Sequence, residues 1–132
     1  MKTVKIIIER SEDMFSAFAE NVQGIYAGGN TVDEVKQSVL DSIRLLKEFN
    51  SPNNIPDILK GEYEIVYHFD TVSLLSYYKG IFTNSALEKL TGINQKQIQH
   101  YATGHRKPRA EQREKIETAL HALGRELLAV EL

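Results

Sequence analysis

The chain has 132 residues, which is enough for one ordinary domain or two small ones. Its 42% hydrophobic and 26% charged residues are typical of globular proteins and exclude long disorder. No apolar run approaches the roughly 18 to 20 residues that a membrane-spanning helix needs, and the first residues become charged too early for a secretory signal. We therefore expect a cytoplasmic protein with no membrane partner. Because the chain has no cysteine and its four histidines lack HxxxH or HxH spacing, we also expect no disulfide, no metal site and no cofactor.

The net charge of −2 is unevenly distributed along the chain. Residues 1–69 hold seven Lys/Arg and eleven Asp/Glu, a net charge of −4, whereas residues 70–132 hold nine and seven, a net charge of +2. The excess is sharper within residues 94–115, where the charged side chains are Lys96, Arg106, Lys107, Arg109, Arg113 and Lys115 against Glu111 and Glu114. This asymmetry indicates an acidic partner-binding domain over 1–69 and a phosphate-contacting domain over 70–132.

The first strands are predicted from β-branched and alternating residues. Val4–Arg10 is rich in isoleucine and valine and leads into a turn at Ser11–Asp13. A second strand is predicted over Met14–Glu20, and a third around Ile25–Ala27 that stops at Gly28-Gly29. These elements would form a meander with tight turns.

A helix should follow, because Thr31 and Glu34 have the spacing of a capping box. Its apolar residues recur at three- and four-residue steps, which predicts one stripe packed on the meander. The stripe consists of Val32, Val35, Val39, Ile43, Leu46 and Phe49, and the residues expected in water are Lys36, Asp41, Arg44 and Lys47. Prolines 52 and 56 should end the helix, and Glu62–Phe69 is predicted as a fourth strand. The predicted fold of the first domain is therefore α+β in the order β-β-β-α-β.

Two segments of this domain resemble the N-terminal domain of HicB-type antitoxins. They are Phe15–Ile25 and Gly28–Val35, the second of which opens the long helix. The resemblance implies a partial ribonuclease-H-like fold that binds and silences a small HicA-like mRNA-cleaving toxin. An acidic domain suits docking to a basic RNA-cutting enzyme.

Catalysis by this domain is not expected. A ribonuclease H site needs several carboxylates that converge on divalent metal ions. The first strand offers only Glu9 near its end, while Asp13 and Glu20 fall in turn or strand-edge positions. Solvation is the simpler explanation of these acids.

The second half of the chain is predicted to form short helices. A helix is predicted over Thr71–Tyr78, and another follows Gly80, capped by Thr83 or by Ser85 with Glu88, and ends at Gly92. Asn94 is a good N-cap for a third helix, Gln95–Ala102, with Ile98 and Tyr101 directed inward. A closing helix is predicted over Glu111–Leu123, with Ile116, Leu120 and Leu123 inward and Gly124 as its end. The tail 126–132 fits a strand or a helix, and its apolar residues suggest packing on another subunit.

The third of these helices has the chemistry of a DNA-reading helix. A short helix, a glycine turn and a second short helix can place the second helix in the major groove. Glutamine can pair with adenine and lysine with guanine, which suits the set Gln95, Lys96 and Gln97. The cations of the following loop, residues 103–109, suit phosphates.

Residues 86–108 closely resemble the Xre (Cro/C1-type) helix-turn-helix family. Ala86–Gln95 stands at the position of that family's turn motif and is similar to it. The resemblance implies base contacts from Gln95, Lys96, Gln97 and His100. It also implies contacts to the DNA backbone from Asn94, His105, Arg106 and Lys107. Ala102-Thr103 departs from the family, which often carries a charged pair there.

The order of the two domains predicts an antitoxin that binds its toxin and represses their shared operon as at least a dimer. One alternative is a stand-alone transcriptional regulator whose first domain senses a small ligand or dimerises. A second alternative is an enzyme with a residual metal-dependent nuclease site that includes Glu9.

Overall fold

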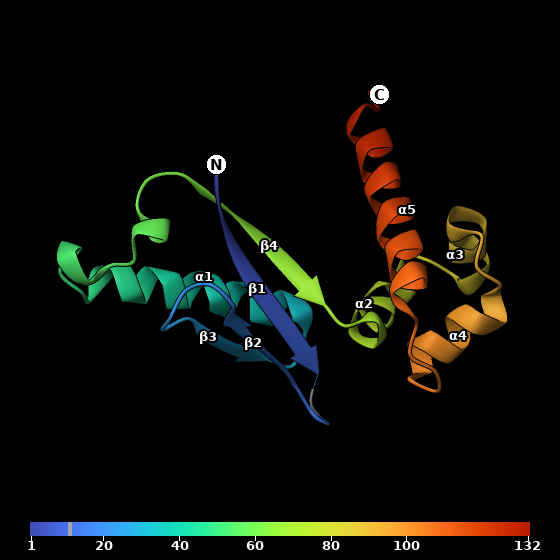
Figure 1. Cartoon of the computed structure of the whole chain (residues 1–132), viewed down its shortest axis with the longest axis horizontal. Coiled ribbons are helices and arrows are strands. Elements are labelled where there is room, and N and C mark those ends of the chain that lie inside the picture. The colour runs from blue at the N-terminus through green and yellow to red at the C-terminus, as the bar shows by residue number, and fades with distance from the viewer. Residues whose placement is uncertain (11) are drawn as a thin grey trace. The chain divides into compact units, whose positions relative to one another are not determined.

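A computed structural model describes residues 1–10 and 12–132 (Figure 1), so Ser11 of the predicted first turn lies outside the described residues. The chain divides into two compact units, Met1–Asp70 and Thr71–Leu132. The change in charge along the sequence predicts this boundary one residue earlier, between residues 69 and 70. Within the described ranges, no helix combines the length and the apolar composition needed to cross a membrane.

The first unit is built on a mixed sheet. Its described strands are β1 (Lys2–Arg10), β2 (Phe15–Ala19), β3 (Tyr26–Gly29) and β4 (Tyr63–Phe69), in the spatial order β3-β2-β1-β4. β1 is antiparallel to β2 and parallel to β4, and β2 is antiparallel to β3. The predicted order β-β-β-α-β and the α+β class are confirmed for this unit.

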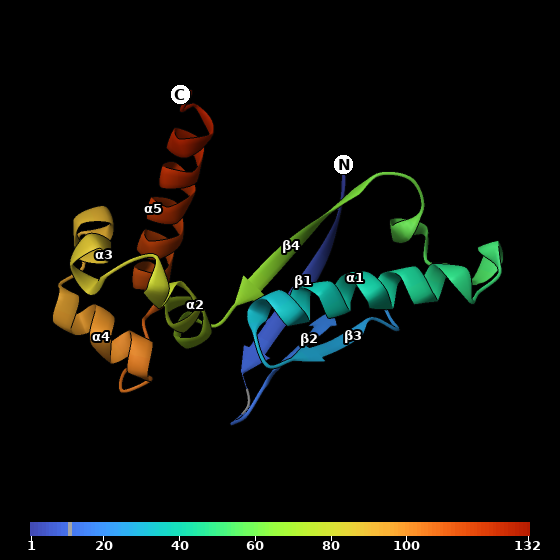
Figure 2. The same cartoon turned by 180° about the vertical axis from the view of Figure 1, so that it is seen from behind.

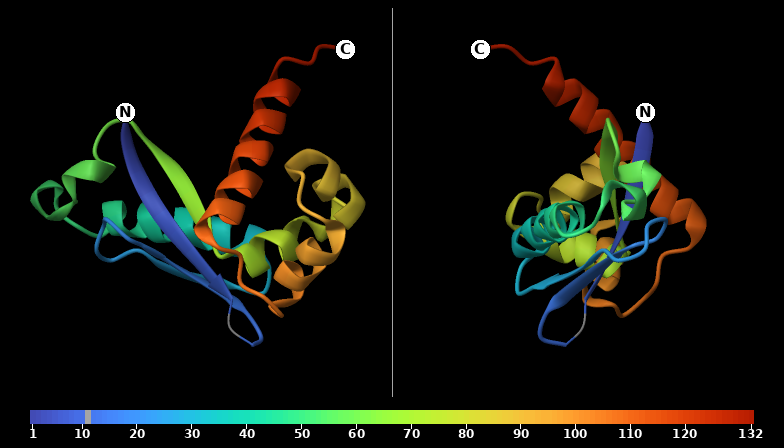
Figure 3. Two further views of the ribbon diagram at one scale, coloured as in Figure 1. Left: turned by 45° about the vertical axis from the view of Figure 1, so that its right-hand side comes forward. Right: turned by 90° about the vertical axis from the view of Figure 1, so that its left-hand side faces the viewer.

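Helix α1 (Val32–Glu48) covers one face of this sheet, and Figure 3 shows it nearly end-on beside the strands. The amide of Glu34 donates to the Thr31 hydroxyl at 3.1 Å, as the capping box predicts. The Glu34 carboxylate reaches back one residue further than predicted and accepts from the amide of Asn30 at 2.7 Å. The core between helix and sheet consists of the buried side chains Val4, Ile6, Ile8, Ala17, Ala19, Val32, Val35, Val39 and Ile43.

The predicted apolar stripe of α1 is wrong at its C-terminal end. Leu46 is half-buried, and Phe49 has 78% of its surface exposed. The last turn of the helix extends beyond the start of β3 (Figure 2), and Phe49 follows this turn. The periodicity of the stripe continues where the surface that it packs on has ended.

Two lysines of α1 that were expected in water lie over tyrosine rings of β4. The Lys36 ammonium is 4.8 Å from the ring centroid of Tyr67, and the Lys47 ammonium is 4.9 Å from that of Tyr63. Cation–π contacts and the burial of long aliphatic stems both favour this placement. Burial raises the pKa of the Tyr67 hydroxyl.

The third strand continues through Gly28-Gly29, where the sequence predicted its end. Gly28 pairs with Ser16 and Gly29 with Phe15. A Cβ added at Gly29 would lie 2.7 Å from the Cβ of Glu34, so α1 can begin this close to the strand only beside glycine. Gly29 therefore allows a close approach of helix and strand, and the two glycines continue the strand.

The second unit is helical. Its elements are α2 (Thr71–Tyr77), a 3-10 turn (Tyr78–Gly80), α3 (Asn84–Thr91), α4 (Gln95–Thr103) and α5 (Ala110–Leu128). The core of this unit consists of Leu75, Leu87, Ile93, Ile98, Tyr101 and Ile116, with Leu74, Phe82, Ala102 and Leu120 packed against it. The inward direction predicted for Ile98 and Tyr101 is confirmed.

The structure selects one of two predicted starts for α3 and moves the predicted end of α5. Of the two caps proposed for α3, Thr83 is the one formed, because its hydroxyl accepts from the amide of Ala86 at 3.0 Å. Helix α5 was predicted to end at Gly124 but continues through it to Leu128. Glycine permits a left-handed helix end and also tolerates the helical conformation at a modest cost.

The opposite roles of Gly92 and Gly124 yield a stability prediction. Gly92 ends α3 with φ of +77°, a conformation that costs an alanine roughly 1 kcal/mol or more. Gly124 lies inside α5, and an added Cβ there meets nothing within 4 Å. We expect Gly92→Ala to lower the free energy of unfolding by about 1 kcal/mol and Gly124→Ala to raise it by about 0.5 to 1 kcal/mol. Thermal unfolding followed by circular dichroism measures both, and shifts of the same sign would contradict this assignment.

Candidate functional site

The turn between α3 and α4 is short and anchored at several points. It contains Gly92, Ile93 and Asn94. Ile93 is buried in the core of the unit, and its amide donates to the Thr91 hydroxyl at 3.1 Å. The turn is therefore held by a buried side chain and by local hydrogen bonds, which fixes the start of α4 relative to α3.

The N-terminus of α4 is capped by two side chains. As predicted, Asn94 is its N-cap, and its Oδ1 accepts from the amide of Lys96 at 2.8 Å. The Glu88 carboxylate accepts from the amide of Gln95 at 2.7 Å, so Glu88 serves α4 and not the capping box predicted within α3. The Nδ2 group of Asn94 remains as the part of this side chain able to donate to a phosphate.

The exposed face of α4 differs in part from the predicted set. Burial of Ile98 and Tyr101 directs one side of the helix inward. The exposed residues of α4 are Gln95, Lys96, Gln99 and Thr103, whereas Gln97 and His100 are half-buried. The predicted base contacts from Gln95 and Lys96 therefore start from exposed side chains. The base contacts predicted for Gln97 and His100 start from side chains that are only partly exposed.

The two half-buried residues have defined surroundings. The Gln97 Nε2 group donates to the hydroxyl of Tyr101 at 2.9 Å, which occupies one of its amide hydrogens. The rings of His100 and His105 have centroids 4.8 Å apart. The Nδ1 atom of His100 is buried and has no hydrogen-bond partner among the described residues. Both side chains are thus held at the edge of the exposed face and not in its centre.

Gln99 belongs to this face but was not among the predicted residues. Its Oε1 accepts from the Nδ2 group of Asn84 at 2.7 Å, across the angle between α3 and α4. Gln99 lies one helical turn after Gln95, so helical spacing alone would have placed both on one face.

The cationic loop follows α4 directly. Gly104 ends the helix with φ of +79°, and the exposed side chains of the loop are His105, Arg106, Lys107 and Arg109. The amide of Arg106 donates to the carbonyl of His100 at 3.2 Å. The guanidinium of Arg113, on α5, donates to the carbonyl of the buried Pro108 at 2.8 Å. The loop is thus tied to the helices on either side, and its cations remain in solvent.

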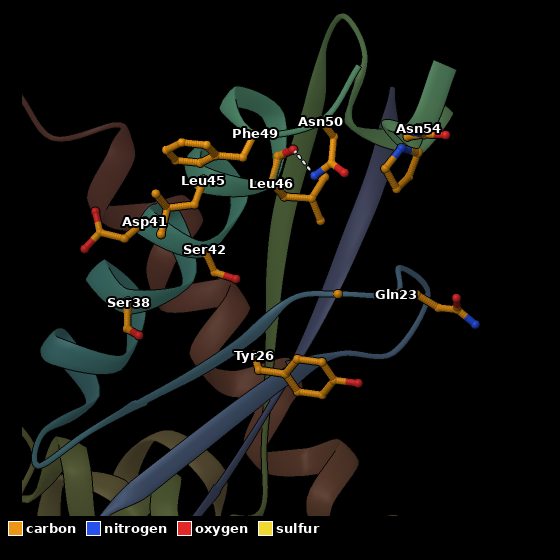
Figure 4. A pocket seen from close by; sticks show the side chains of 12 residues that line it. Gln23, Tyr26, Ser38, Asp41, Ser42, Leu45, Leu46, Phe49, Asn50 and Asn54 are labelled. Atoms are coloured by element: carbon orange, nitrogen blue, oxygen red, sulfur yellow. Dashed lines mark hydrogen bonds between the residues drawn. The ribbon is translucent and has the colours of Figure 1, made fainter. Parts of the chain in front are cut away.

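A second candidate surface is a groove in the first unit (Figure 4), beside the C-terminal half of α1. It is lined by Gln23, Gly24, Tyr26, Ser38, Asp41, Ser42, Leu45, Leu46, Phe49, Asn50, Asn54 and Pro56. Its apolar residues are unusually exposed, with 78% of Phe49, 74% of Tyr26 and 45% of Leu45 accessible. Exposed aromatic residues that gather in one depression are typical of protein interfaces.

Among the described residues of the first unit, carboxylates do not converge on one point. Glu9 pairs with Ser16 at the end of β1 and is exposed. Within residues 1–10 and 12–132, no three His, Cys, Asp or Glu side chains lie close enough to hold a metal ion. The arrangement around Glu9 therefore offers no argument for metal-dependent cleavage.

Comparison of the chain with family models, curated proteins and solved structures finds no match. The resemblances to HicB-type antitoxins and to the Xre family therefore rest on the residues quoted for them.

Proposed function

We propose that the chain is a HicB-like antitoxin that silences a small HicA-like mRNA-cleaving toxin through its first unit and represses its own operon through its second. The observation that carries this proposal is the pair α3 and α4, joined by a three-residue turn. The second helix presents an exposed polar face and is followed by a cationic loop. We interpret this pair as a helix-turn-helix of the Xre type with α4 as its reading helix.

The side chains of α4 and its loop supply both kinds of DNA contact. Gln95 and Lys96 lie in the first turn of the helix, which is the part that meets base edges when a reading helix enters the major groove. Both carry groups that match purine edges. Arg106 and Lys107 lie in the loop beside it and suit the phosphate backbone, which fixes register without reading sequence.

The first unit supports the toxin-binding half of the proposal. A meander of three strands, a covering helix and a fourth strand parallel to the first is consistent with the partial ribonuclease-H-like fold that the HicB resemblance implies. Residues 1–69 carry a net charge of −4, which suits a basic RNA-cutting partner. The groove with Phe49, Tyr26 and Leu45 gives such a partner an apolar contact surface.

Helix α5 supports pairing of two copies. Its C-terminal half extends away from α2, α3 and α4 (Figure 1). Leu127 and Leu128 are 60% and 88% exposed there, and Leu127 lies one helical turn after the half-buried Leu123. An exposed apolar stripe on an unsupported helix is stabilised when a second helix covers it. A dimer would read two half-sites about 34 Å apart.

The DNA-binding half is tested by selecting duplexes from a randomised pool with the purified chain. We expect an inverted repeat with half-sites about one helical turn apart. Lys96→Ala should lower the preference at one base pair of each half-site by about 1 to 3 kcal/mol, because a base contact is lost. Lys89→Ala, an exposed lysine of α3, removes the same charge and should leave base preference unchanged. Binding of all duplexes with equal affinity by the unaltered chain would contradict a sequence-specific repressor.

A further inference from the structure

We infer that Asn84 and Gln99 act as a pair in base recognition, with Gln99 as the residue that contacts the base and Asn84 as the residue that positions it. This inference rests on the proposed DNA-binding function of the second unit. Neither residue belongs to the contacts that the Xre resemblance implies. The pair links the first turn of α3 to the middle of α4, 15 residues apart in the chain.

The geometry of α3 and α4 holds this pair in place. Asn84 is the first residue of α3, directly after the Thr83 cap, whose hydroxyl accepts from the amide of Ala86 at 3.0 Å. The two helices are packed together through the buried residues Leu87 and Ile98. Asn84 is half-buried and Gln99 is exposed. The positioning residue is therefore fixed to the fold, while the residue that it holds faces solvent.

The direction of the hydrogen bond determines what Gln99 offers to DNA. Its Oε1 accepts from Asn84 Nδ2 at 2.7 Å, which leaves the two N–H groups of Nε2 for other partners. Acceptors on the major-groove edges are guanine O6 and N7, adenine N7 and thymine O4. In this arrangement Gln99 presents a donor toward the duplex. The pair thus favours an acceptor base, and cytosine, with its N4 donor, should be disfavoured at that position.

The pair also reduces the entropy that Gln99 loses on binding. A free glutamine side chain samples many rotamers and must give up this freedom when it contacts a base. Because Asn84 already restrains Gln99, less freedom remains to be lost in the complex. Loss of Asn84 should therefore lower discrimination at the base that Gln99 contacts, and at no other base.

The experiment measures the affinity of the full chain for its selected duplex with each of the four base pairs at every position. Gln99→Ala identifies the base pair that Gln99 contacts, where discrimination should fall about tenfold. Asn84→Ala should lower discrimination at the same base pair by about three- to tenfold, and the double variant should be no worse than Gln99→Ala. Ser85→Ala, in the same turn of α3, is the matched control and should leave the profile unchanged.

A further variant tests the direction of the bond. In Asn84→Asp the new side chain can only accept, so Gln99 must turn its Nε2 group toward it and its Oε1 toward the duplex. The preference at that base pair should shift toward bases that offer a donor, adenine N6 or cytosine N4. A structural role of Asn84 alone would lower affinity without changing which base is preferred.

The possible outcomes separate the pair from the proposed function. If the unaltered chain selects a consensus but Asn84→Ala and Gln99→Ala affect different positions, or add independently, the pair is overturned and the DNA-binding proposal stands. Equal weakening at every position by Asn84→Ala, with an unchanged preference, also overturns it. If the unaltered chain selects no consensus, both proposals fail. Circular dichroism of each variant confirms that the helices are retained.

Discussion

Replacement of both Arg106 and Lys107 by alanine is expected to weaken binding to every duplex, whatever its sequence. Each phosphate contact releases counterions, so the slope of log affinity against log salt changes by about 0.9 per contact. Loss of both should make the slope shallower by about 1.8 and lower the affinity about tenfold or more at low salt. Fluorescence anisotropy on a labelled duplex, repeated over a range of salt concentrations, measures both effects.

The structure gives this prediction a specific control. Arg106 and Lys107 are exposed in a loop that is tied to α4 by the His100 carbonyl and to α5 by Arg113. Replacement of both Lys79 and Arg125 by alanine removes two exposed cations of the same unit that lie outside the loop. If this control changes the slope as much as the loop variant does, the effect is one of net charge and the loop has no special role.

Much of the local structure could be predicted because it depends on neighbours in the chain. The caps at Thr31 and Asn94 are read from side chains that accept amide hydrogens two or three residues away. Strand β1 was predicted from its run of β-branched residues, which starts at Val4. Both kinds of signal are complete within about ten residues of sequence.

The errors occur where the outcome depends on how one element meets the next. Phe49 continues the stripe of α1, but it is exposed because the sheet beneath it has ended. Glycine commonly follows the end of a helix, yet α5 continues through Gly124 to Leu128. Glu88 was expected to cap its own helix and instead accepts from Gln95 in the next one. Spacing along the chain cannot distinguish these outcomes.

The exposed face of α4 also combines features that local sequence predicts with features that depend on packing. Helical spacing places Gln95 and Lys96 correctly on the exposed side of α4. It cannot show that Gln97 is held by Tyr101 or that Gln99 is held by Asn84, because each bond depends on side-chain packing. The local pattern identifies the helix, while contacts within and between helices determine which of its residues are available.

Substitution of Phe49 by serine is expected to weaken binding of the toxin partner by about thirtyfold or more without affecting DNA binding. Large aromatic residues at the centre of an interface commonly contribute 2 kcal/mol or more, which corresponds to this change. Phe49 is 78% exposed and lines the groove, so its replacement should cost the isolated chain little stability. The measurement is the concentration of chain that inhibits RNA cleavage by a small basic protein recovered with the chain in a pull-down from the native host.

Leu40→Ser is the matched control for this variant. Leu40 is also an exposed apolar residue of α1, with 47% of its surface accessible, but it is not among the residues that line the groove. If Leu40→Ser impairs inhibition and Phe49→Ser does not, the toxin contacts another side of α1. If the unaltered chain inhibits no RNA-cleaving partner, the antitoxin half of the proposal is wrong, while the DNA-binding half remains open to its own test. The two units therefore make separable predictions, because the groove lies wholly in the first unit and the reading helix wholly in the second.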